Sequence, residues 1–493
     1  MPRKGSAPSR PPLTKSKDNY HLHNSSLLIA ACVSLGVICI FLLSRSYPAN
    51  NLGPPIWKTI HTTSIHSRTE WDDTSRQFSL DLTKHEVPLV ITNGPATLWG
   101  DLADQWDFHN LIPQSTADSF VLQQCRVHSS PLFVLERERD VGGMIGAEQS
   151  SPVLYEDISL NYFMNTLFSK EKFLYWTGLM SSFTSTDRTP LPTKSAPSLQ
   201  HLAYTSWAAF HVMEPALLQG LQDQGDDFWE PMLWLSQPGV VAQTHFDSQH
   251  NFFTTIFGIR RFTFFPPSFE MNPFPSIHRS NRQSQLHLEE EAHALLFKDN
   301  IKMSNISEME QQQMTYQIDL MPGETLYIPP YWYHRVETLS PSLGVSVNSP
   351  SAVEAILQQA LWTAVPLGAF HTVPQKKSAV VLYLQLLVEN VCTMALQEFA
   401  RVLYKSRYSL LFPPLWIETH HPGYSCEWEQ MHPAVIEKFS STVHSIASIV
   451  EEAHASMAIR KVFLSDYIEQ MSRWAVGEVR DTAPYIYHCL AAW

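Results

Sequence analysis

The pattern of apolar and polar positions changes along this chain of 493 residues. Between residues 230 and 350, short apolar runs such as LWLS, FTFF and LYIP alternate with turns that contain glycine or proline. This pattern is typical of β-strands. Beyond residue 350, apolar residues recur every three or four positions, from Leu384 to Val402 and from Ile436 to Ala453, which predicts amphipathic helices. We therefore expect a mainly β core followed by a helical region.

Before the core, the pattern predicts shorter flanking elements. Apolar runs that end in turns predict strands, and apolar residues on one side of a longer segment predict helices. These elements are expected at Val87–Pro95, Leu98–Leu111, Phe120–Val127, Leu132–Glu136, Leu160–Phe168 and from Phe173 onward. We assign residues 70–229 to the N-terminal part of the domain, residues 230–350 to its core, and residues 351–493 to a C-terminal helical region.

The N-terminal segment has a third pattern. Between Asn24 and Arg45 no residue is charged, and the run LLIAACVSLGVICIFLL is apolar or small throughout. Because about 17–25 such residues can span a bilayer, we expect a transmembrane helix at residues 25–43. A cleaved signal peptide is the alternative, but its apolar region is usually about 7–15 residues long, and no A-x-A site closes this one.

The charged residues on either side of this segment predict its orientation in the membrane. The first 44 residues carry five basic side chains and one acidic one, and few basic residues follow closely. The positive-inside rule then leaves residues 1–24 as a cytosolic tail. Residues 44–69 mix Pro, Asn, Ser and Thr without an apolar period, which favours a stalk. We expect a single-pass type II membrane protein whose body is lumenal or extracellular.

Composition narrows the classes of partner. The formal net charge is −13, because residues 1–44 carry +4 and the remaining residues carry −17. An acidic body of this kind offers no electrostatic footprint for nucleic acid. Hydrophobic residues make up 44% of the chain and 14 residues are Trp, which is ample for a large core.

The candidate chemistry lies in the β core, at His245 and Asp247. Residues i and i+2 of a strand point to one face, so this imidazole and carboxylate can reach one cation. His334, in the segment PPYWYHRVE, is the candidate third ligand. Two histidines and one carboxylate leave open coordination positions and suit non-haem Fe(II) oxygenases. The alternative is a cupin-like barrel whose histidines only pack.

The order of motifs adds specificity. After H-x-D come the run NFF, Gly258, a basic pair and FPP, and later RQSQ, PG-x-x-LYIP, YW-x-H and V-x-V-N. This order resembles the JmjC branch of the Fe(II)/2-oxoglutarate oxygenases, and most of all the asparaginyl hydroxylase that acts on hypoxia-inducible factor. The resemblance implies a double-stranded β-helix (jelly-roll, cupin) core with flanking α/β elements.

The resemblance also implies roles for single residues. His245, Asp247 and His334 would be the catalytic residues that hold Fe(II), and 2-oxoglutarate would be the co-substrate. Its distal carboxylate would pair with Arg260, where the asparaginyl hydroxylase has lysine. A guanidinium can bind a carboxylate through two parallel bonds and stays charged when buried. Arg261, one residue further along the strand, should face away.

Four more positions bear on the co-substrate. Asn251 and Asn348 match asparagines that lie near it in the family. Tyr175, in a strand before the barrel, stands where a tyrosine hydrogen-bonds 2-oxoglutarate; a core tyrosine is the alternative. Ala242 replaces a threonine that contacts 2-oxoglutarate in the hydroxylase, so one hydrogen bond would be missing.

The six cysteines fall into two groups. Two lie in the apolar N-terminal segment, and Cys125, Cys392, Cys426 and Cys489 lie in the body. Their wide spacing excludes a C-x-x-C zinc motif. In an oxidising lumen one or two disulfides would form, most plausibly among Cys392, Cys426 and Cys489, with a pairing that sequence does not fix. Free buried thiols are the alternative.

These features together favour a membrane-anchored Fe(II)/2-oxoglutarate dioxygenase that hydroxylates a protein side chain. A homodimer through the C-terminal helices is an expectation from the family, and packing of those helices onto their own barrel is the alternative. Two other functions stay open, a non-catalytic JmjC-like binding module and another cupin metalloenzyme such as a sugar isomerase. The carboxylate two residues after His245 argues against the latter, because such cupins usually use more histidines and a glutamate.

Overall fold

The computed structural model describes residues 60–61, 87–92, 121–133, 153–179, 231–267, 271, 273–275, 282–285, 316–477 and 479–492. The chain divides into two compact units, Met1–Ile56 and Trp57–Trp493, and every described residue lies in the second. The segment expected to span a membrane, residues 25–43, and the helix expected at Leu98–Leu111 lie outside the described residues.

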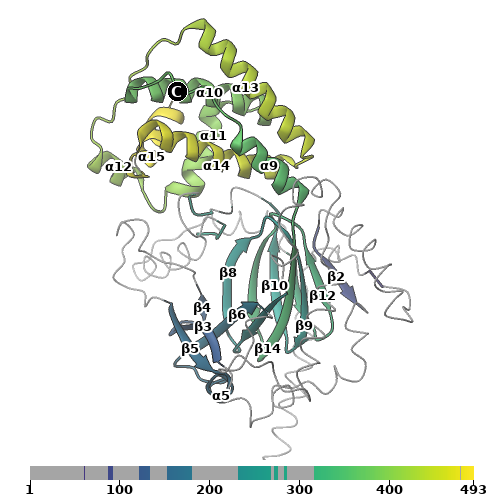
Figure 1. Ribbon diagram of the computed structural model, residues 1–493. Helices are drawn as coiled ribbons and strands as arrows, with labels where there is room; N and C mark the ends of the chain where they lie inside the picture. Colours follow the sequence, from purple (N-terminus) through teal and green to yellow (C-terminus); the bar gives the residue numbers. More distant parts are fainter. Residues whose placement is uncertain are drawn as a thin grey trace, which may run out of the picture. The chain divides into compact units, whose positions relative to one another are not determined.

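The described strands form two sheets (Figure 1). The larger sheet has, in spatial order, β1 (Ile60–His61), β2 (Leu89–Thr92), β12 (Thr325–Ile328), β9 (His250–Phe257), β14 (Ser342–Ser349), β7 (Met232–Ser236), β6 (Phe173–Leu179), β3 (Val121–His128) and β5 (Leu154–Ser159). The smaller sheet has β11 (Tyr316–Leu320), β10 (Arg260–Phe265), β13 (Tyr333–Thr338), β8 (Val241–Phe246) and β4 (Leu132–Phe133).

Apolar side chains from both sheets meet in one core. Phe253 and Leu326 come from the larger sheet, and Phe262 and Phe264 come from the smaller one. Along β10, buried and half-buried residues alternate, as expected for a strand with one face on a core. From β7 to β14, each strand lies in the opposite sheet from the strand before it, except that β10 and β11 share a sheet. The two sheets pack face to face. The expected cupin, or jelly-roll, core is therefore confirmed.

The flanking elements extend the larger sheet. Strands β2 and β6 lie within expected segments, and β3 runs one residue past the segment expected to end at Val127. The expected strand from Leu132 is present as β4, which joins the smaller sheet, and the short helix α5 (Leu160–Asn165) begins where one is expected. The strand β5 was not expected, because its residues LYEDIS are mostly exposed and lack a clear alternation. Within the segment expected to be a stalk, β1 pairs in parallel with β2.

The C-terminal region is helical. It contains α9 (Ala352–Trp362), α10 (Val373–Cys392), α11 (Leu396–Leu403), η6 (Tyr404–Tyr408), α12 (Pro414–His420), α13 (Pro433–Glu452), α14 (Met457–Val476), α15 (Val479–Tyr485) and η7 (Ile486–Leu490). The apolar stripes lie mainly inside this region, since Leu384, Val388, Phe439 and Val443 are all at most 2% exposed. The stripes are therefore covered within one chain.

The hydropathy of these helices is only weak evidence for a membrane span. Among the described residues, no single helix combines the length and apolar character needed to cross a bilayer. One pair, Val373–Cys392 with Leu396–Tyr408, passes by length and composition, with a bend of 90° between its two parts.

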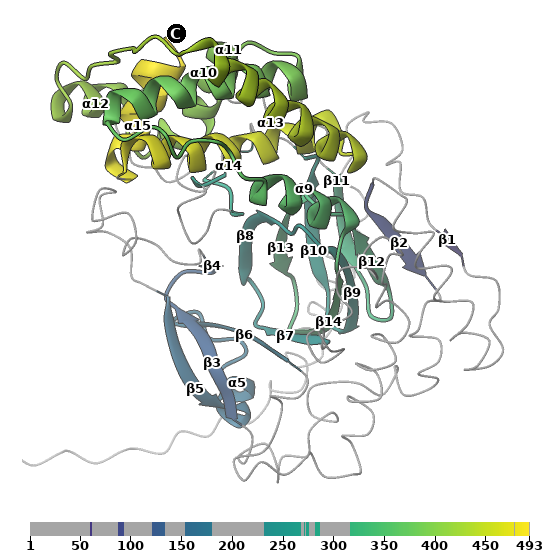
Figure 2. The same ribbon diagram turned by 45° about the horizontal axis from the view of Figure 1, so that its top comes forward.

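The helical region lies against one end of the barrel (Figure 2), and side chains of both parts share one buried cluster. Phe246, Tyr331 and Tyr333 of the barrel belong to the same buried cluster as the helical residues. Gln285 Nε2 donates to the carbonyl oxygens of Pro273 and Arg407, at 3.0 and 2.9 Å. The helices therefore pack against the side of the barrel that carries Phe246.

The cysteine pairing is decided by packing. Cys426 and Cys489 form a disulfide with a Cα–Cα distance of 5.6 Å, whereas Cys125 and Cys392 are buried free thiols. The disulfide joins the segment after α12 to η7 across 63 residues of sequence. One of the expected disulfides is therefore present, and Cys392 is not part of it.

Candidate metal centre

The structure brings together the three expected metal ligands. His245 lies on β8, Asp247 follows the end of that strand, and His334 lies on the adjacent antiparallel strand β13. His245 and His334 are register partners, and their ring centroids are 4.2 Å apart. One ligand atom from each of the three side chains lies within 4.8 Å of the other two. Among the described residues, this is the one group of three or more potential ligands with such spacing.

A β-bulge interrupts the pairing of β8 with β13 next to the three ligands. Between the pairs His334–His245 and Val336–Ala242, two residues of β8 lie opposite one residue of β13. Such a bulge twists a strand and redirects its side chains. Ala242 packs against the buried cluster that contains Tyr175.

Hydrogen bonds set the imidazole tautomers. His245 Nδ1 lies 2.7 Å from the carbonyl oxygen of Gln243, and His334 Nδ1 lies 3.1 Å from that of Trp332. A carbonyl oxygen only accepts, so each Nδ1 carries the proton and each Nε2 offers a lone pair. The Nε2 atom of His334 is 3.9 Å from Asp247 Oδ2, which is suitable for two ligands of one ion.

Charge states at neutral pH suit a cation. Burial, with a smaller contribution from His245, lowers the pKa of His334 to about 4, so its imidazole is neutral. Burial opposes ionisation of Asp247, but His245, His334 and a hydrogen bond from Asn251 together hold its pKa below the usual value. The site therefore offers a neutral imidazole of His334 and an ionised carboxylate, which are the forms that bind a divalent metal.

Arg260 is a buried cation with no acidic partner among the residues that the structure describes. Its side chain is 2% exposed and lies 5.1 Å from the centre of the Phe253 ring. It donates to the Trp234 carbonyl oxygen at 2.7 Å and to the Ser342 hydroxyl. No described carboxylate forms an ion pair with it. Burial lowers its pKa to about 10, so the guanidinium remains charged at neutral pH.

A buried charge normally has a partner, since desolvation of an unpaired ion costs several kcal/mol. Arg260 therefore fits the carboxylate of a ligand that enters the barrel. Arg261 contrasts with it: its guanidinium is about one third exposed and pairs with Asp319 through bonds of 2.7 and 2.9 Å. The expectation that Arg261 faces away from the barrel interior is confirmed.

The other candidate residues lie near the triad. Asn251 on β9 donates from Nδ2 to Asp247 Oδ2 at 3.3 Å and is the register partner of Asn348 on β14. The Oδ1 atoms of both asparagines are buried without a hydrogen bond. Tyr175 on β6 is 5% exposed and interacts electrostatically with Arg260 and Asp247. Unsatisfied amide oxygens and a buried phenol provide polar contacts for a small ligand.

Sequence reasoning did not assign roles to several residues of this site. Gln283 pairs with His245 through an isolated bridge, and its Oε1 atom is buried without a hydrogen bond. Ser342 holds Arg260, and the Tyr331 amide donates to the Asp247 carbonyl oxygen at 2.7 Å. The motifs RQSQ and YW-x-H contain Gln283 and Tyr331, but the contacts join segments far apart in sequence.

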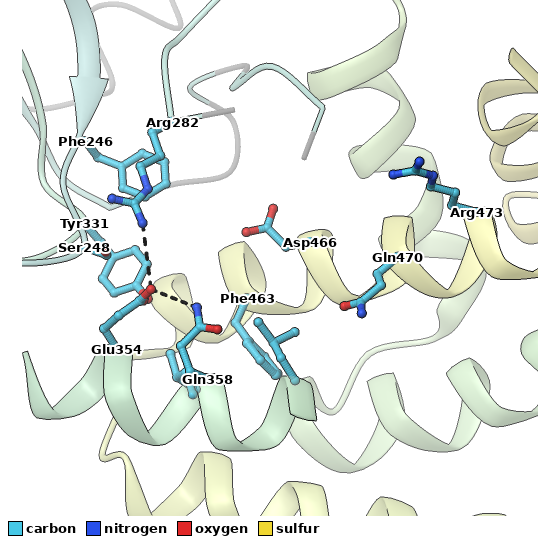
Figure 3. A pocket seen from close by; sticks show the side chains of 12 residues that line it. Phe246, Ser248, Arg282, Tyr331, Glu354, Gln358, Phe463, Asp466, Gln470 and Arg473 are labelled. Carbon is cyan, nitrogen blue, oxygen red and sulfur yellow. Dashed lines mark hydrogen bonds and ion pairs between the residues drawn. The ribbon is translucent and has the colours of Figure 1, made fainter. Parts of the chain in front are cut away.

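A pocket of roughly 430 Å³ lies between the barrel and the helices α9 and α14, next to Asp247 (Figure 3). The barrel contributes Phe246, Ser248, Arg282 and Tyr331, so the pocket borders both neighbours of Asp247. The helical wall consists of Glu354, Leu357, Gln358 and Leu361 of α9 and of Phe463, Asp466, Gln470 and Arg473 of α14.

The fold and the triad define the class of this protein. The barrel carries His245 on β8, Asp247 just after the end of β8 and His334 on the neighbouring β13, and two histidines with one carboxylate are the ligand set of non-haem Fe(II) oxygenases. The family model described as "Cupin-like domain" matches residues 75–349, which is more than half of the chain. The chain belongs to this family.

Individual relatives match only part of this chain, at low identity. "Jumonji C domain-containing protein 5" of Drosophila melanogaster is 31% identical over 117 residues, or 23% of this chain and 26% of that protein. "HSPB1-associated protein 1" of Homo sapiens is 26% identical over 216 residues, 42% of this chain and 40% of that protein. "Lysine-specific demethylase JMJ31" of Arabidopsis thaliana is 26% identical over 118 residues, 23% and 19% respectively. The matches cover less than half of each relative.

Proposed function

We propose that this protein is an Fe(II)- and 2-oxoglutarate-dependent dioxygenase that hydroxylates a protein side chain. The observation that carries the proposal is one barrel that combines a three-ligand metal site with a buried arginine for which no described carboxylate is a partner. Three protein ligands leave coordination positions for a bidentate 2-oxoacid and dioxygen. The two imidazoles and one carboxylate therefore fit Fe(II), and the Arg260 guanidinium fits a carboxylate of 2-oxoglutarate.

Each side chain has a defined task in this proposal. His245, Asp247 and His334 hold the metal, and Asn251 orients the Asp247 carboxylate through its 3.3 Å hydrogen bond. Arg260 binds the distal carboxylate of 2-oxoglutarate and is itself held by Ser342. When bound, the metal and 2-oxoglutarate supply the oxidation: dioxygen delivers one oxygen atom to the substrate C–H bond and one to succinate, which forms with release of carbon dioxide.

Tyr175 and Asn348 line the remaining space for the co-substrate in this proposal. Burial raises the pKa of Tyr175, so its phenol stays protonated and can donate a hydrogen bond. The buried Oδ1 atom of Asn348 has no partner and can accept one. Ala242 offers no hydrogen bond, so the affinity for 2-oxoglutarate depends mainly on Arg260.

The compartment and assembly are also proposals. A disulfide such as Cys426–Cys489 persists in oxidising compartments, which supports a lumenal or extracellular body behind a membrane anchor at residues 25–43. The particular closeness to the asparaginyl hydroxylase and the homodimer through the C-terminal helices remain predictions. Light scattering of the purified body tests the dimer.

Turnover of 2-oxoglutarate decides between enzyme and binding module. We expect purified protein with Fe(II) to convert 2-oxoglutarate to succinate, and we expect lumenal proteins from producing cells to carry a mass gain of one oxygen atom that cells without the gene lack. Protein that binds neither metal nor 2-oxoglutarate would favour the binding module. Metal-dependent activity without 2-oxoglutarate would favour another cupin metalloenzyme.

A further inference from the structure

Tyr331 has an unusual backbone conformation beside the metal centre. Its φ angle is +66°, in the left-handed region that residues with a side chain rarely adopt. Such a conformation persists only where the surroundings hold it in place, and it is common at functional sites. Tyr331 lies in the loop between β12 and β13, three residues before the ligand His334.

The backbone of Tyr331 holds a metal ligand. Its amide donates to the Asp247 carbonyl oxygen at 2.7 Å. Asp247 lies just beyond the end of β8, where the regular pairing with β13 has ended. This bond therefore fixes the main chain at the point from which the Asp247 carboxylate reaches the metal.

The side chain of Tyr331 is held by the helical region. Its ring is 6% exposed and stacks on Phe246 at 5.6 Å between centroids. Its hydroxyl donates to Glu354 Oε2 on α9. Figure 3 shows Gln358 and Arg282 directed toward Glu354. Glu354 accepts a hydrogen bond from Gln358 at 3.0 Å and lies 3.9 Å from the Arg282 guanidinium.

A second contact supports the same strand from the helical side. The segment that contains Gln285 runs beside β8, where Ser284 donates its amide to the Thr244 carbonyl oxygen at 2.8 Å. Gln285 in turn donates to the Arg407 carbonyl oxygen. The helical region thus contacts both segments that flank the end of β8.

From these contacts we propose that the helical region positions Asp247 through Tyr331, and that Tyr331 and Glu354 act as one pair of positioning residues. The hydroxyl–carboxylate bond anchors the ring, the anchored ring keeps the loop in its left-handed conformation, and the loop amide holds Asp247. The inference rests on the proposed function in that Asp247 is taken as a metal ligand. Residues that orient a ligand typically affect metal affinity about 10–100-fold.

The experiment measures Mn(II) affinity by calorimetry and the visible spectrum of bound Co(II), which reports ligand geometry. We expect Tyr331→Phe, which keeps the ring, to weaken Mn(II) binding about tenfold and to change the Co(II) spectrum. Glu354→Ala should act alike, and the double variant should be no weaker than either single one, because the two residues share one interaction. Glu354→Gln keeps an acceptor and should retain most of the affinity.

Tyr383→Phe is the matched control, since it removes a buried hydroxyl bond of 2.8 Å to Tyr467 inside the helical region. It should lower the melting temperature of the metal-free protein without changing metal affinity. Wild-type affinity in Tyr331→Phe would overturn this inference alone, and so would equal weakening by Tyr383→Phe. Wild-type protein that binds no metal would overturn the proposed function together with it.

Discussion

At the scale of single residues, the chemistry depends on which charges are paired. Asp247 faces two imidazoles, and Arg261 pairs with Asp319 at the surface. Arg260, its neighbour in sequence, is buried without a described acidic partner. The two adjacent arginines thus lie in different environments, because strand alternation sends them to opposite faces.

Replacing Asp247 with Ala tests the metal site. The change removes the one anionic protein ligand, so metal content and metal-dependent decarboxylation of 2-oxoglutarate should both be nearly lost while the barrel stays folded. Elemental analysis and circular dichroism measure these outcomes. Asp319→Ala, which removes a surface carboxylate, is the control and should keep wild-type metal content. Equal metal content in the two variants would refute the triad.

Replacing Arg260 tests the co-substrate site. Arg260→Ala leaves a buried carboxylate unpaired, a loss of about 3–5 kcal/mol, which corresponds to about a hundredfold or more in 2-oxoglutarate affinity. Arg260→Lys should be milder, because the charge survives without the paired geometry. Calorimetry with Mn(II) in place of Fe(II) measures the affinities. Arg261→Ala should bind as wild type does, and a similar loss there would contradict the assignment.

At the scale of elements, one of the two helical stripes is interrupted where periodicity gave no sign of a break. The stripe from Leu384 to Val402 belongs to two helices, because Thr393 adopts a left-handed conformation with φ of +51° and ends α10. The apolar spacing continues across the break, since both helices pack into one core. Periodicity reports the buried face but not the direction of the helix axis.

The disulfide between Cys426 and Cys489 gives an element-scale prediction. It closes a loop of 63 residues, so its loss should lower the free energy of unfolding by ~2–4 kcal/mol. Urea unfolding with and without reductant measures the change in the wild type and in Cys426→Ser. Reductant should destabilise the wild type and the control Cys392→Ala, but not Cys426→Ser. Equal stability of the wild type in both conditions would contradict the pairing.

At the scale of the whole molecule, the barrel and the helices form one compact unit. Residues Trp57–Trp493 are not divided at residue 351, where the apolar pattern changes from that of strands to that of helices. The shared cluster around Phe246 and Tyr333 explains this, because neither part buries those aromatic residues alone. A change from strand to helix patterns therefore does not mark a domain boundary here.

Topology is the whole-molecule prediction, and it follows from the charge asymmetry around residues 25–43. In sealed microsomes the body should resist added protease until detergent is present. Asn305, in the sequon Asn-Ile-Ser, should be glycosylated, whereas Asn24 should stay bare on the cytosolic side. Both asparagines lie outside the described residues. A glycosidase-dependent mass shift that Asn305→Gln abolishes measures the first point, and digestion of the body without detergent would refute the orientation.

The sequence by itself determined the features that depend on local periodicity. The H-x-D spacing predicted that His245 and Asp247 reach one cation, and the structure brings them together although Asp247 lies just past the end of β8. Strand alternation separated Arg260 from Arg261, and helical spacing identified the residues that are buried after residue 350. These inferences hold because the side-chain direction in a strand or helix follows from spacing alone. The order of the motifs supplied His334 as the third ligand.

Only the tertiary structure decided which distant residues meet. It paired Cys426 with Cys489 rather than with Cys392, left Arg260 without a described acidic neighbour, and joined Tyr331 to Glu354. These contacts depend on how the helical region packs against the barrel, and the spacing of residues within one element carries no information about that packing. Periodicity therefore indicates what each element can bury, whereas packing determines the partners of each polar group.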